Sequence, residues 1–147
     1  MNTPVSVLLA RKGQDVHSID SSARVIEAVR LMNERRVGSV VILEGGRLAG
    51  IFTERDVLSR VVAVGLDPIA TPVSAVMTGG LHTIAPETTL GETMEIFTNK
   101  RCRHLPVLEQ GQLIGLISIG DVSRWLSEAH RAEAEQLRQY IAGGFPG

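Results

Sequence analysis

The sequence predicts an α/β protein made of two similar halves, because the first half returns in the second without insertions or deletions. Residues 16–57 align with residues 81–122, so each residue is matched 65 positions later. The segment 50–56, a Gly followed by apolar residues and then Thr-x-x-Asp, is matched by Gly, apolar residues and Ser-x-x-Asp at 115–121. Each half is small for a stable core of its own, so we expect the two halves to share an interface.

The first half has the pattern strand, helix, strand, strand, helix. Its first long helix is indicated by Val25, Ala28, Val29 and Met32, which are spaced for one apolar face. The pair Gly45-Gly46 between apolar runs indicates a hairpin. The predicted elements are a short helix from Thr3-Pro4 to Gly13, a strand at 16–19, a helix at 24–34, strands at 39–43 and 48–52, and a helix from Thr53 to Gly65 with Val57, Leu58, Val61 and Val62 on its apolar face.

The second half repeats this plan after a linker at 66–71, in which Asp67-Pro68 forms the turn. Pro106 cannot donate to a strand ladder, so its strand is expected to be an edge there or to open toward a cleft. The last helix runs from Ser118 to Gly143, or else the charged stretch 128–138 forms a separate, more solvated helix. The other predicted elements are a short helix at 72–77, a strand at 82–84, a helix at 89–99, and strands at 104–108 and 113–117.

Composition excludes several classes of protein. Of the 147 residues, 44% are hydrophobic and 21% charged, with a net charge of −1, as in a soluble globular protein. The lone Cys102 cannot form an internal disulfide, and no signal-type or membrane-spanning apolar run is present, so we expect a cytoplasmic protein. Aromatic residues make up 3%, and the last helix mixes Glu128, Glu133 and Glu135 with arginines, so nucleic-acid binding is not expected.

The two Ser/Thr-x-x-Asp segments have two compatible interpretations. Each can be a capping box at a helix start, in which the hydroxyl and the carboxylate accept from backbone N–H groups; such a cap stabilises a helix by about 1 kcal/mol. Alternatively, Asp56 and Asp121 accept the two hydroxyls of a ribose while the helix N-terminus faces a phosphate. Cys102 aligns with the apolar Val37 and is interpreted as a packing residue, and the four histidines lack ligand spacing, so no metal is expected.

Five segments carry a resemblance to a known family: 53–57, 76–78, 103–107, 118–121 and 137–143. With the duplication, they make the chain similar to the tandem CBS domain pair, also called a Bateman module, and to stand-alone bacterial two-CBS proteins. The resemblance implies a first CBS domain at 5–67, a second at 72–130 and a C-terminal helical extension at 131–147. It also implies two units related by a pseudo-twofold axis, packed through their sheets, with two clefts that bind AMP, ADP, ATP, NAD or S-adenosylmethionine, and a homodimer.

Two ligand sites follow from the resemblance. Arginines can hold phosphate oxygens in bidentate fashion, and Gly38-Ser39 replace Arg103-His104 in the first repeat. The site of Asp121 is therefore expected to be the better nucleotide pocket, while Arg36 and Arg101 are interpreted as surface charges. The main site is expected to contain Ser18, Arg103, His104, Ser118 and Asp121, and the second site Gly38, Ser39, Thr53, Arg55, Asp56, His82 and Thr83.

The expected function is a non-catalytic regulatory module for signal transduction and energy sensing, which binds an adenine nucleotide, changes its dimer conformation and signals to an effector protein. No catalytic cofactor is expected. An enzyme is not expected, because Asp56 and Asp121 belong to different repeats and have no acidic neighbours to share a metal. The alternative is a ligand-independent interaction or scaffold module with vestigial clefts, which would use the last helix and the apolar faces after Thr53 and Ser118.

Overall fold

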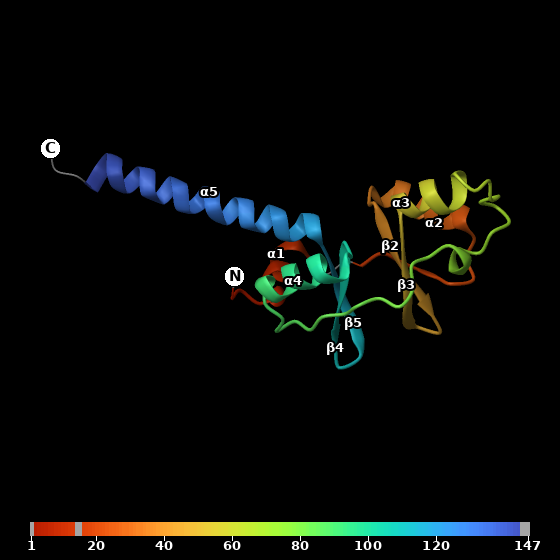
Figure 1. The fold of residues 1–147 in the computed structure, drawn as a ribbon. Helices are drawn as coiled ribbons and strands as arrows, with labels where there is room; N and C mark the ends of the chain where they lie inside the picture. The colour runs from red at the N-terminus through yellow and green to blue at the C-terminus, as the bar shows by residue number, and fades with distance from the viewer. Residues whose placement is uncertain (1, 14–15, 145–147) are drawn as a thin grey trace.

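The computed structural model describes residues 2–13 and 16–144, and it contains two α/β halves and a long C-terminal helix (Figure 1). The elements are, in order, α1 (Val5–Lys12), β1 (Ser18–Asp20), α2 (Val25–Arg35), β2 (Ser39–Glu44), β3 (Arg47–Thr53), α3 (Glu54–Asp56), the π-helical η1 (Val57–Val62), the 3₁₀-helical η2 (Val73–Ala75), α4 (Leu90–Lys100), β4 (His104–Glu109), β5 (Gln112–Ser118) and α5 (Ile119–Gly144). The mixed α/β class and the two similar units predicted from the sequence are confirmed.

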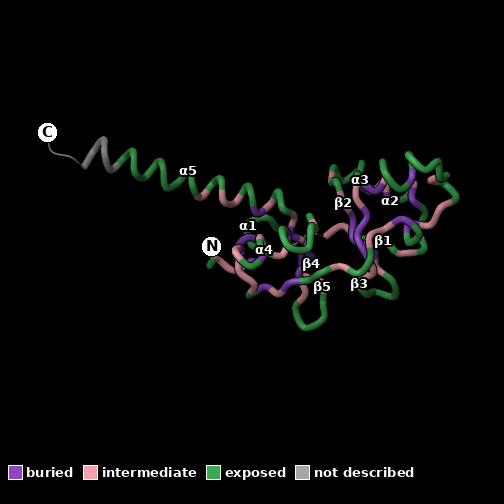
Figure 2. Tube along the Cα trace, viewed as in Figure 1, coloured by how far each residue is buried: buried purple, intermediate pink, exposed green. Residues whose placement is uncertain are grey.

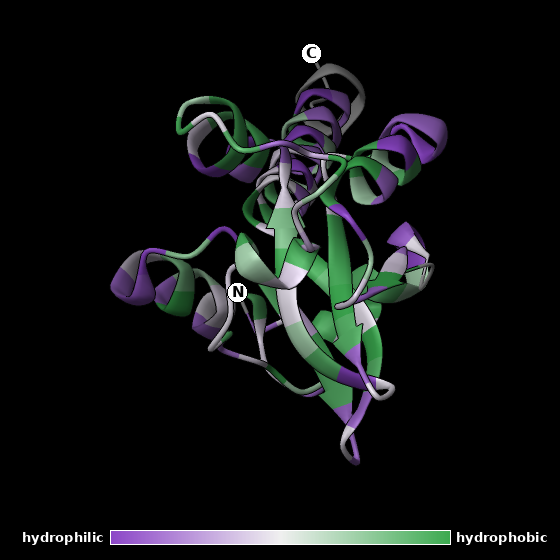
Figure 3. Cartoon of the chain, turned by 90° about the vertical axis from the view of Figure 1, so that its right-hand side faces the viewer, coloured by the Kyte–Doolittle hydropathy of each residue, from purple (hydrophilic) through white to green (hydrophobic). Residues whose placement is uncertain are grey.

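Each half contains one β-hairpin at its centre. The first sheet has the order β1-β2-β3, with β1 parallel to β2, whereas β4 and β5 form a two-stranded sheet. Both hairpins shift register once, after Ile42 and after Val107, which are equivalent positions of the two repeats. The hairpin strands are the most hydrophobic part of the fold and lie at its centre (Figure 3). The two repeats therefore share even the position of this irregularity, which is typical of a β-bulge.

The segment before each repeat packs on the other repeat's core. Thr3–Ser6 and Thr71–Ser74 have the same sequence, Thr-Pro-Val-Ser, and make equivalent hydrogen bonds. The Val5 amide donates to Thr88 O (2.7 Å) and the Val73 amide donates to Ala23 O (2.8 Å). As a result the buried face of α1, with Val5, Leu8 and Leu9, packs in the second half (Figure 2), and Val73 of η2 packs in the first. These two segments complete the two cores.

The predicted strand at 82–84 is wrong, because only a single parallel bridge joins Ile84 to Val107. In the first repeat the equivalent bridge is part of β1, and the Val41 amide donates to His17 O at 2.9 Å. Pro106 occupies the position of Val41 in the second repeat and has no N–H to donate. The second sheet therefore stops at β4, which confirms the edge position predicted for Pro106.

Three other predictions need correction. Pro4 is the N-cap of α1 rather than its first residue, and the helix predicted at 72–77 is only the 3₁₀ turn η2. The helix after Thr53 continues as η1, whose wider turn leaves Leu58 and Val62 67% and 65% exposed, not on a buried face.

The last helix is continuous. α5 runs for 26 residues from Ile119 to Gly144 and projects away from both cores (Figure 1), so a separate helix at 128–138 is excluded. Residues 145–147 of the predicted extension lie outside the described ranges.

Candidate functional site

Each repeat positions one nearly buried aspartate at the start of a helix. Thr53 Oγ1 accepts from the Asp56 amide (3.3 Å), and Asp56 Oδ2 accepts from the Thr53 amide (3.0 Å). Ser118 Oγ accepts from the Asp121 amide (3.1 Å), and Asp121 Oδ2 accepts from the Ser118 amide (2.8 Å). The capping interpretation is confirmed in both repeats. In each box the cap takes one carboxylate oxygen, Oδ2.

A cavity of about 650 Å³ opens beside Asp56, between the two halves. Five cationic side chains line it against two carboxylates, those of Glu54 and Asp56. Its volume is in the range of small-molecule sites, and its excess of positive charge suits an anion. The cavity is lined by Gly38, Thr53, Glu54, Arg55, Asp56, Ser59, Arg60, Thr78, Gly79, Gly80, Leu81, His82, Lys100, Arg101, Cys102, Arg103 and His104.

Asp56 has a cation beside its second oxygen. Arg60 Nε lies 3.6 Å from Asp56 Oδ1, one helical turn away, and the Arg60 guanidinium also donates to Met77 O at 3.1 Å. The Asp56 side chain is 9% exposed, yet it lines the cavity. Its Oδ1 remains available as an acceptor for a hydroxyl group, because the cap is made by Oδ2.

His104 lies at the boundary between the two repeats. Burial, together with the positive charges of Lys12 and Arg103, lowers the pKa of His104 below 6.5, although the charges of Asp121 and Asp56 act in the opposite direction. His104 therefore senses both capping aspartates and is favoured as a neutral imidazole. A neutral imidazole can both donate and accept within the cavity.

Seven of the predicted site residues line this one cavity: Gly38, Thr53, Arg55, Asp56, His82, Arg103 and His104. The first five were assigned to the second site, but Arg103 and His104 were assigned to the Asp121 site. In the structure Arg103 and His104 line the space beside Asp56. Their assignment to the Asp121 site stays a prediction. β4 starts at His104, and the Arg103 carbonyl accepts from the Ile119 amide (2.9 Å), which holds residue 103 at the start of α5.

The remaining predicted residues lie elsewhere. Ser39 pairs with Thr53 across the first hairpin and does not line the Asp56 cavity. Thr83 lines a different cavity of about 720 Å³ near the hairpin loops. Ser18 is exposed on β1, opposite Val41. Ser118 and Asp121 stay together in the cap of α5.

Asp121 already has a cationic partner in the chain. Lys12 Nζ donates to Asp121 Oδ2 at 2.5 Å and to Leu116 O at 2.7 Å. Burial acts to raise the pKa of Asp121, but the bonds from Lys12 and Ser118 outweigh it and hold that pKa below 3.8. The cavity that touches Asp121 has a volume of only about 250 Å³. Of these two cavities, the one beside Asp56 is the larger and has more cationic side chains in its lining.

Sequence reasoning missed several residues of the Asp56 cavity. Arg101 was interpreted as a surface charge, but it ends α4 in the left-handed conformation (φ 52°) and lines the cavity, as does Lys100. Arg60 was not considered, although its position four residues after Asp56 on a helix was a usable signal. Gly80 could not be found, because only the fold brings it there.

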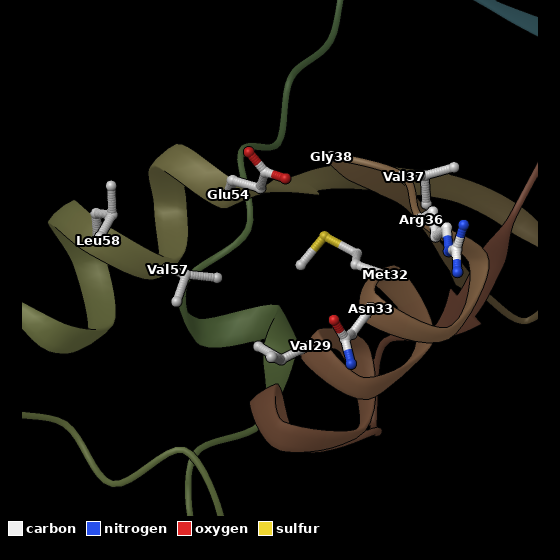
Figure 4. Close-up of a pocket in the computed structure, with 9 residues that line it drawn as sticks. All are labelled: Val29, Met32, Asn33, Arg36, Val37, Gly38, Glu54, Val57 and Leu58. Carbon is white, nitrogen blue, oxygen red and sulfur yellow. The ribbon is translucent and has the colours of Figure 1, made fainter.

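A second, mostly apolar cavity of about 570 Å³ lies between α2 and the helical turns after Thr53 (Figure 4). Val29, Met32, Val57 and Leu58 contribute its apolar wall, and Glu54 stands at its edge. Few polar groups converge here, so this cavity suits an apolar side chain better than a nucleotide.

Among 2–13 and 16–144, no group of three His, Cys, Asp or Glu side chains is placed to hold a metal ion. Cys102 is half-buried and packs against the second core, and burial raises its pKa. No helix in the same part of the chain is both long and apolar enough to cross a bilayer.

Comparison with known proteins decides the family. The family model described as "CBS domain" matches the chain twice, at residues 9–63 and 73–128. The chain belongs to the CBS-domain family. The predicted resemblance to a tandem CBS domain pair is therefore confirmed, and the chain is a regulatory, signal-transduction module.

Several CBS-domain relatives are similar over most of their length. The mitochondrial CBS domain-containing protein CBSX3 of Arabidopsis thaliana is 35% identical over 153 residues, which cover 98% of this chain and 74% of the relative. A putative signal-transduction protein with CBS domains from Burkholderia ambifaria has a TM-score of 0.79 at 36% identity, covering 84% of this chain and 93% of the other. A CBS domain protein from Pyrobaculum aerophilum complexed with AMP has a TM-score of 0.71 at 26% identity, covering 80% and 88%.

Proposed function

We propose that this CBS pair is a non-catalytic sensor that binds an adenine nucleotide in the cavity beside Asp56. The observation that carries the proposal is the composition of that cavity: a capping aspartate with one available oxygen opposes five cationic side chains within about 650 Å³. A ligand for such a site carries hydroxyl groups at one end and negative charge at the other. A ribose phosphate has both.

The ribose end is assigned to Asp56. Its Oδ1 accepts a hydroxyl hydrogen, and the neighbouring Arg60 lies 3.6 Å from the same oxygen. The phosphate end is assigned to Arg103 and Arg101, which line the same cavity from the other repeat. Arginine holds phosphate through two parallel N–H bonds, so these contacts orient the ligand as well as attract it.

A ligand held in this way touches both halves. Asp56 and Arg55 come from the first repeat, whereas Arg103 and His104 come from the second. Binding therefore favours one arrangement of the halves over others, in proportion to the difference in affinity. The AMP complex of the Pyrobaculum relative supports an adenosine ligand for this fold. We infer that an effector protein reads the arrangement.

A thermal-shift screen tests the proposal with AMP, ADP, ATP, NAD and S-adenosylmethionine. A ligand at a hundredfold its dissociation constant adds about 2.7 kcal/mol to the free energy of unfolding. That should raise Tm by on the order of 5–10 °C. Asp56→Ala should abolish the shift, and Asp121→Ala should keep most of it. A well-folded protein that none of these ligands shifts would contradict the proposal.

One observation favours a second function, in which the module works through an apolar surface. Leu58 and Val62 are exposed on η1, and Val64, Leu66 and Ile69 are exposed in the segment that follows. A patch of this kind on a soluble protein marks an interaction site. We infer a second copy of this chain as its occupant, which would make a homodimer whose geometry the ligand adjusts.

Sedimentation velocity tests the dimer. The wild type should sediment as a dimer at micromolar concentration, and Leu58→Glu with Val62→Glu should give monomers with unchanged secondary structure. The matched control is Leu137→Glu, which changes an exposed leucine on α5 outside this patch. A monomeric wild type would exclude the dimer, and a tight dimer without any ligand response would favour the scaffold function.

A further inference from the structure

The two clefts of this CBS pair differ at one structurally equivalent position. Because Thr3–Ser6 and Thr71–Ser74 share a sequence and equivalent hydrogen bonds, the residues after them can be matched one by one. The match is supported further on, where Leu9 packs on Gly115 and Met77 packs on Gly50, a pair that the repeat makes equivalent. Continuing the match places Lys12 opposite Gly80.

Gly80 leaves the Asp56 cleft open. It lines the 650 Å³ cavity with a φ of +60°, and a Cβ built on it would meet no atom within 4 Å. In the other cleft, the side chain of Lys12 crosses to Asp121, 109 residues away in the sequence. There the remaining cavity is about 250 Å³, below the usual range for a bound small molecule.

Lys12 places a positive charge directly on the carboxylate that a ribose would approach. Its ammonium donates to Asp121 Oδ2 and to Leu116 O, and Arg124 lies 3.8 Å from Asp121 Oδ1. Asp56 has a similar neighbour at one oxygen, because Arg60 lies near its Oδ1 as Arg124 lies near that of Asp121. It differs at the other oxygen, because no lysine reaches Asp56 Oδ2. A charged amine on a carboxylate that is 10% exposed competes strongly with neutral hydroxyl groups.

The helix that carries Lys12 is held in place by its neighbour. The Arg11 guanidinium stacks 4.7 Å from the centre of the Trp125 ring and donates to Glu128 at 3.3 Å. Leu8 and Leu9 of the same helix are buried in the second core. The amine is therefore presented to Asp121 by a packed helix, not by a loose surface chain.

We propose that Lys12 is a built-in occupant of the Asp121 cleft, so that each chain binds one nucleotide rather than two. This inference rests on the proposed function, since it assigns the same ligand class to both clefts and explains why only one is open. Removing the ammonium while keeping the length of the side chain, as in Lys12→Met, opens a second nucleotide site of the same chemistry.

Calorimetric titration with AMP and ATP gives the number of sites per chain. The wild type is expected to bind one nucleotide, Lys12→Met two, and Lys12→Met with Asp121→Asn one again. Arg11→Met is the matched control, because it loosens the same helix without touching Asp121, and it should bind one. Circular dichroism and Tm establish that each variant is folded.

The outcomes separate this inference from the proposed function. One site in both the wild type and Lys12→Met would overturn the occupant role and leave the proposed function standing, and two sites in the wild type would also overturn it. Binding by Lys12→Met alone would support the occupant role and overturn the assignment to Asp56. No binding by either protein would overturn both.

A spectroscopic readout adds independent support. Lys12 and Lys100 are the only lysines of the chain, so ¹⁵N-lysine labelling gives at most two ammonium signals. Asp121→Asn should shift the Lys12 signal, and adding AMP to the wild type should leave that signal in place. Displacement of the Lys12 signal by AMP in the wild type would contradict the occupant role.

Discussion

At the scale of single residues, the two repeats use the same aspartate with different neighbours. Both Asp56 and Asp121 cap a helix, as the Ser/Thr-x-x-Asp spacing predicted. The sequence could not predict that Lys12 would reach Asp121, because nothing local connects residues so far apart. The sequence assigned Arg103 to the Asp121 site, whereas in the structure Arg103 lines the cavity beside Asp56. The direction in which a residue at a strand start faces depends on how the halves pack.

The role of Arg103 can be tested directly. If its guanidinium holds a phosphate, Arg103→Met should lose a charge-assisted interaction of about 1.5–3 kcal/mol and weaken ATP binding about 10- to 100-fold. Binding of adenosine, which has no phosphate, should change little. Calorimetry measures both ligands, with the exposed Arg131→Met on α5 as control. Equal losses for ATP and adenosine would show that Arg103 does not contact phosphate.

His104 predicts a pH dependence of stability. Its folded pKa is below 6.5, so the unfolded chain binds the proton more readily as the pH falls. The wild type should therefore lose free energy of unfolding as the pH drops through 6.5 toward the folded pKa, with no such loss above 7. In urea unfolding at pH 7.5 and 5.5, His104→Gln should lose less than the wild type. Identical losses would refute the buried neutral imidazole.

At the scale of elements, the duplication predicted both hairpins and their flanking helices. The prediction failed at one strand, where a single residue differs between the two repeats. The strand expected at 82–84 is missing because Pro106 replaces Val41. The strand was predicted from its equivalent in the first repeat, although the sequence already showed that Pro106 has no N–H to donate. The π-helical turn after Asp56, in which Val61 is buried, had no such signal in the sequence.

Restoring the amide at position 106 should restore the ladder. Pro106→Val gains a hydrogen bond to His82 O, which stabilises the fold by about 0.5–1.5 kcal/mol. Loss of the proline also raises the conformational entropy of the unfolded chain, which lowers the free energy of unfolding by about 0.4–1 kcal/mol. Stability should therefore change little. Hydrogen exchange should instead show a protected amide at 106, comparable with Val41. Rapid exchange at that amide would mean that another cause removes the strand.

Two equivalent glycines should respond differently to a methyl group. A Cβ at Gly50 would lie 2.6 Å from the Thr78 carbonyl oxygen, whereas a Cβ at Gly115 would meet the end of the Leu9 side chain at 2.6 Å. A side chain can turn away, but a paired backbone carbonyl cannot. Gly50→Ala should thus cost about 2–3 kcal/mol and Gly115→Ala about 1 kcal/mol. Chemical denaturation measures both, and a larger cost at Gly115 would contradict this packing.

At the scale of the whole molecule, each half completes the other. The repeat at an offset of 65 residues predicted two units that share an interface, which the structure bears out. The exchange of α1 and η2 between cores was not predicted, because their shared Thr-Pro-Val-Ser segment repeats at a different offset, 68 residues. That exchange positions Lys12 in one cleft and Gly80 in the other, so the structural difference between the clefts is a property of the assembled fold.

The most direct test of a single open nucleotide cleft is a crystal structure of the chain grown with ATP. We expect ligand density beside Asp56, with the ribose on its carboxylate and the phosphates toward Arg101 and Arg103. Lys12 should still be bonded to Asp121. ATP on Asp121 with Lys12 displaced, or an empty Asp56 cleft at saturating ATP, would contradict this expectation.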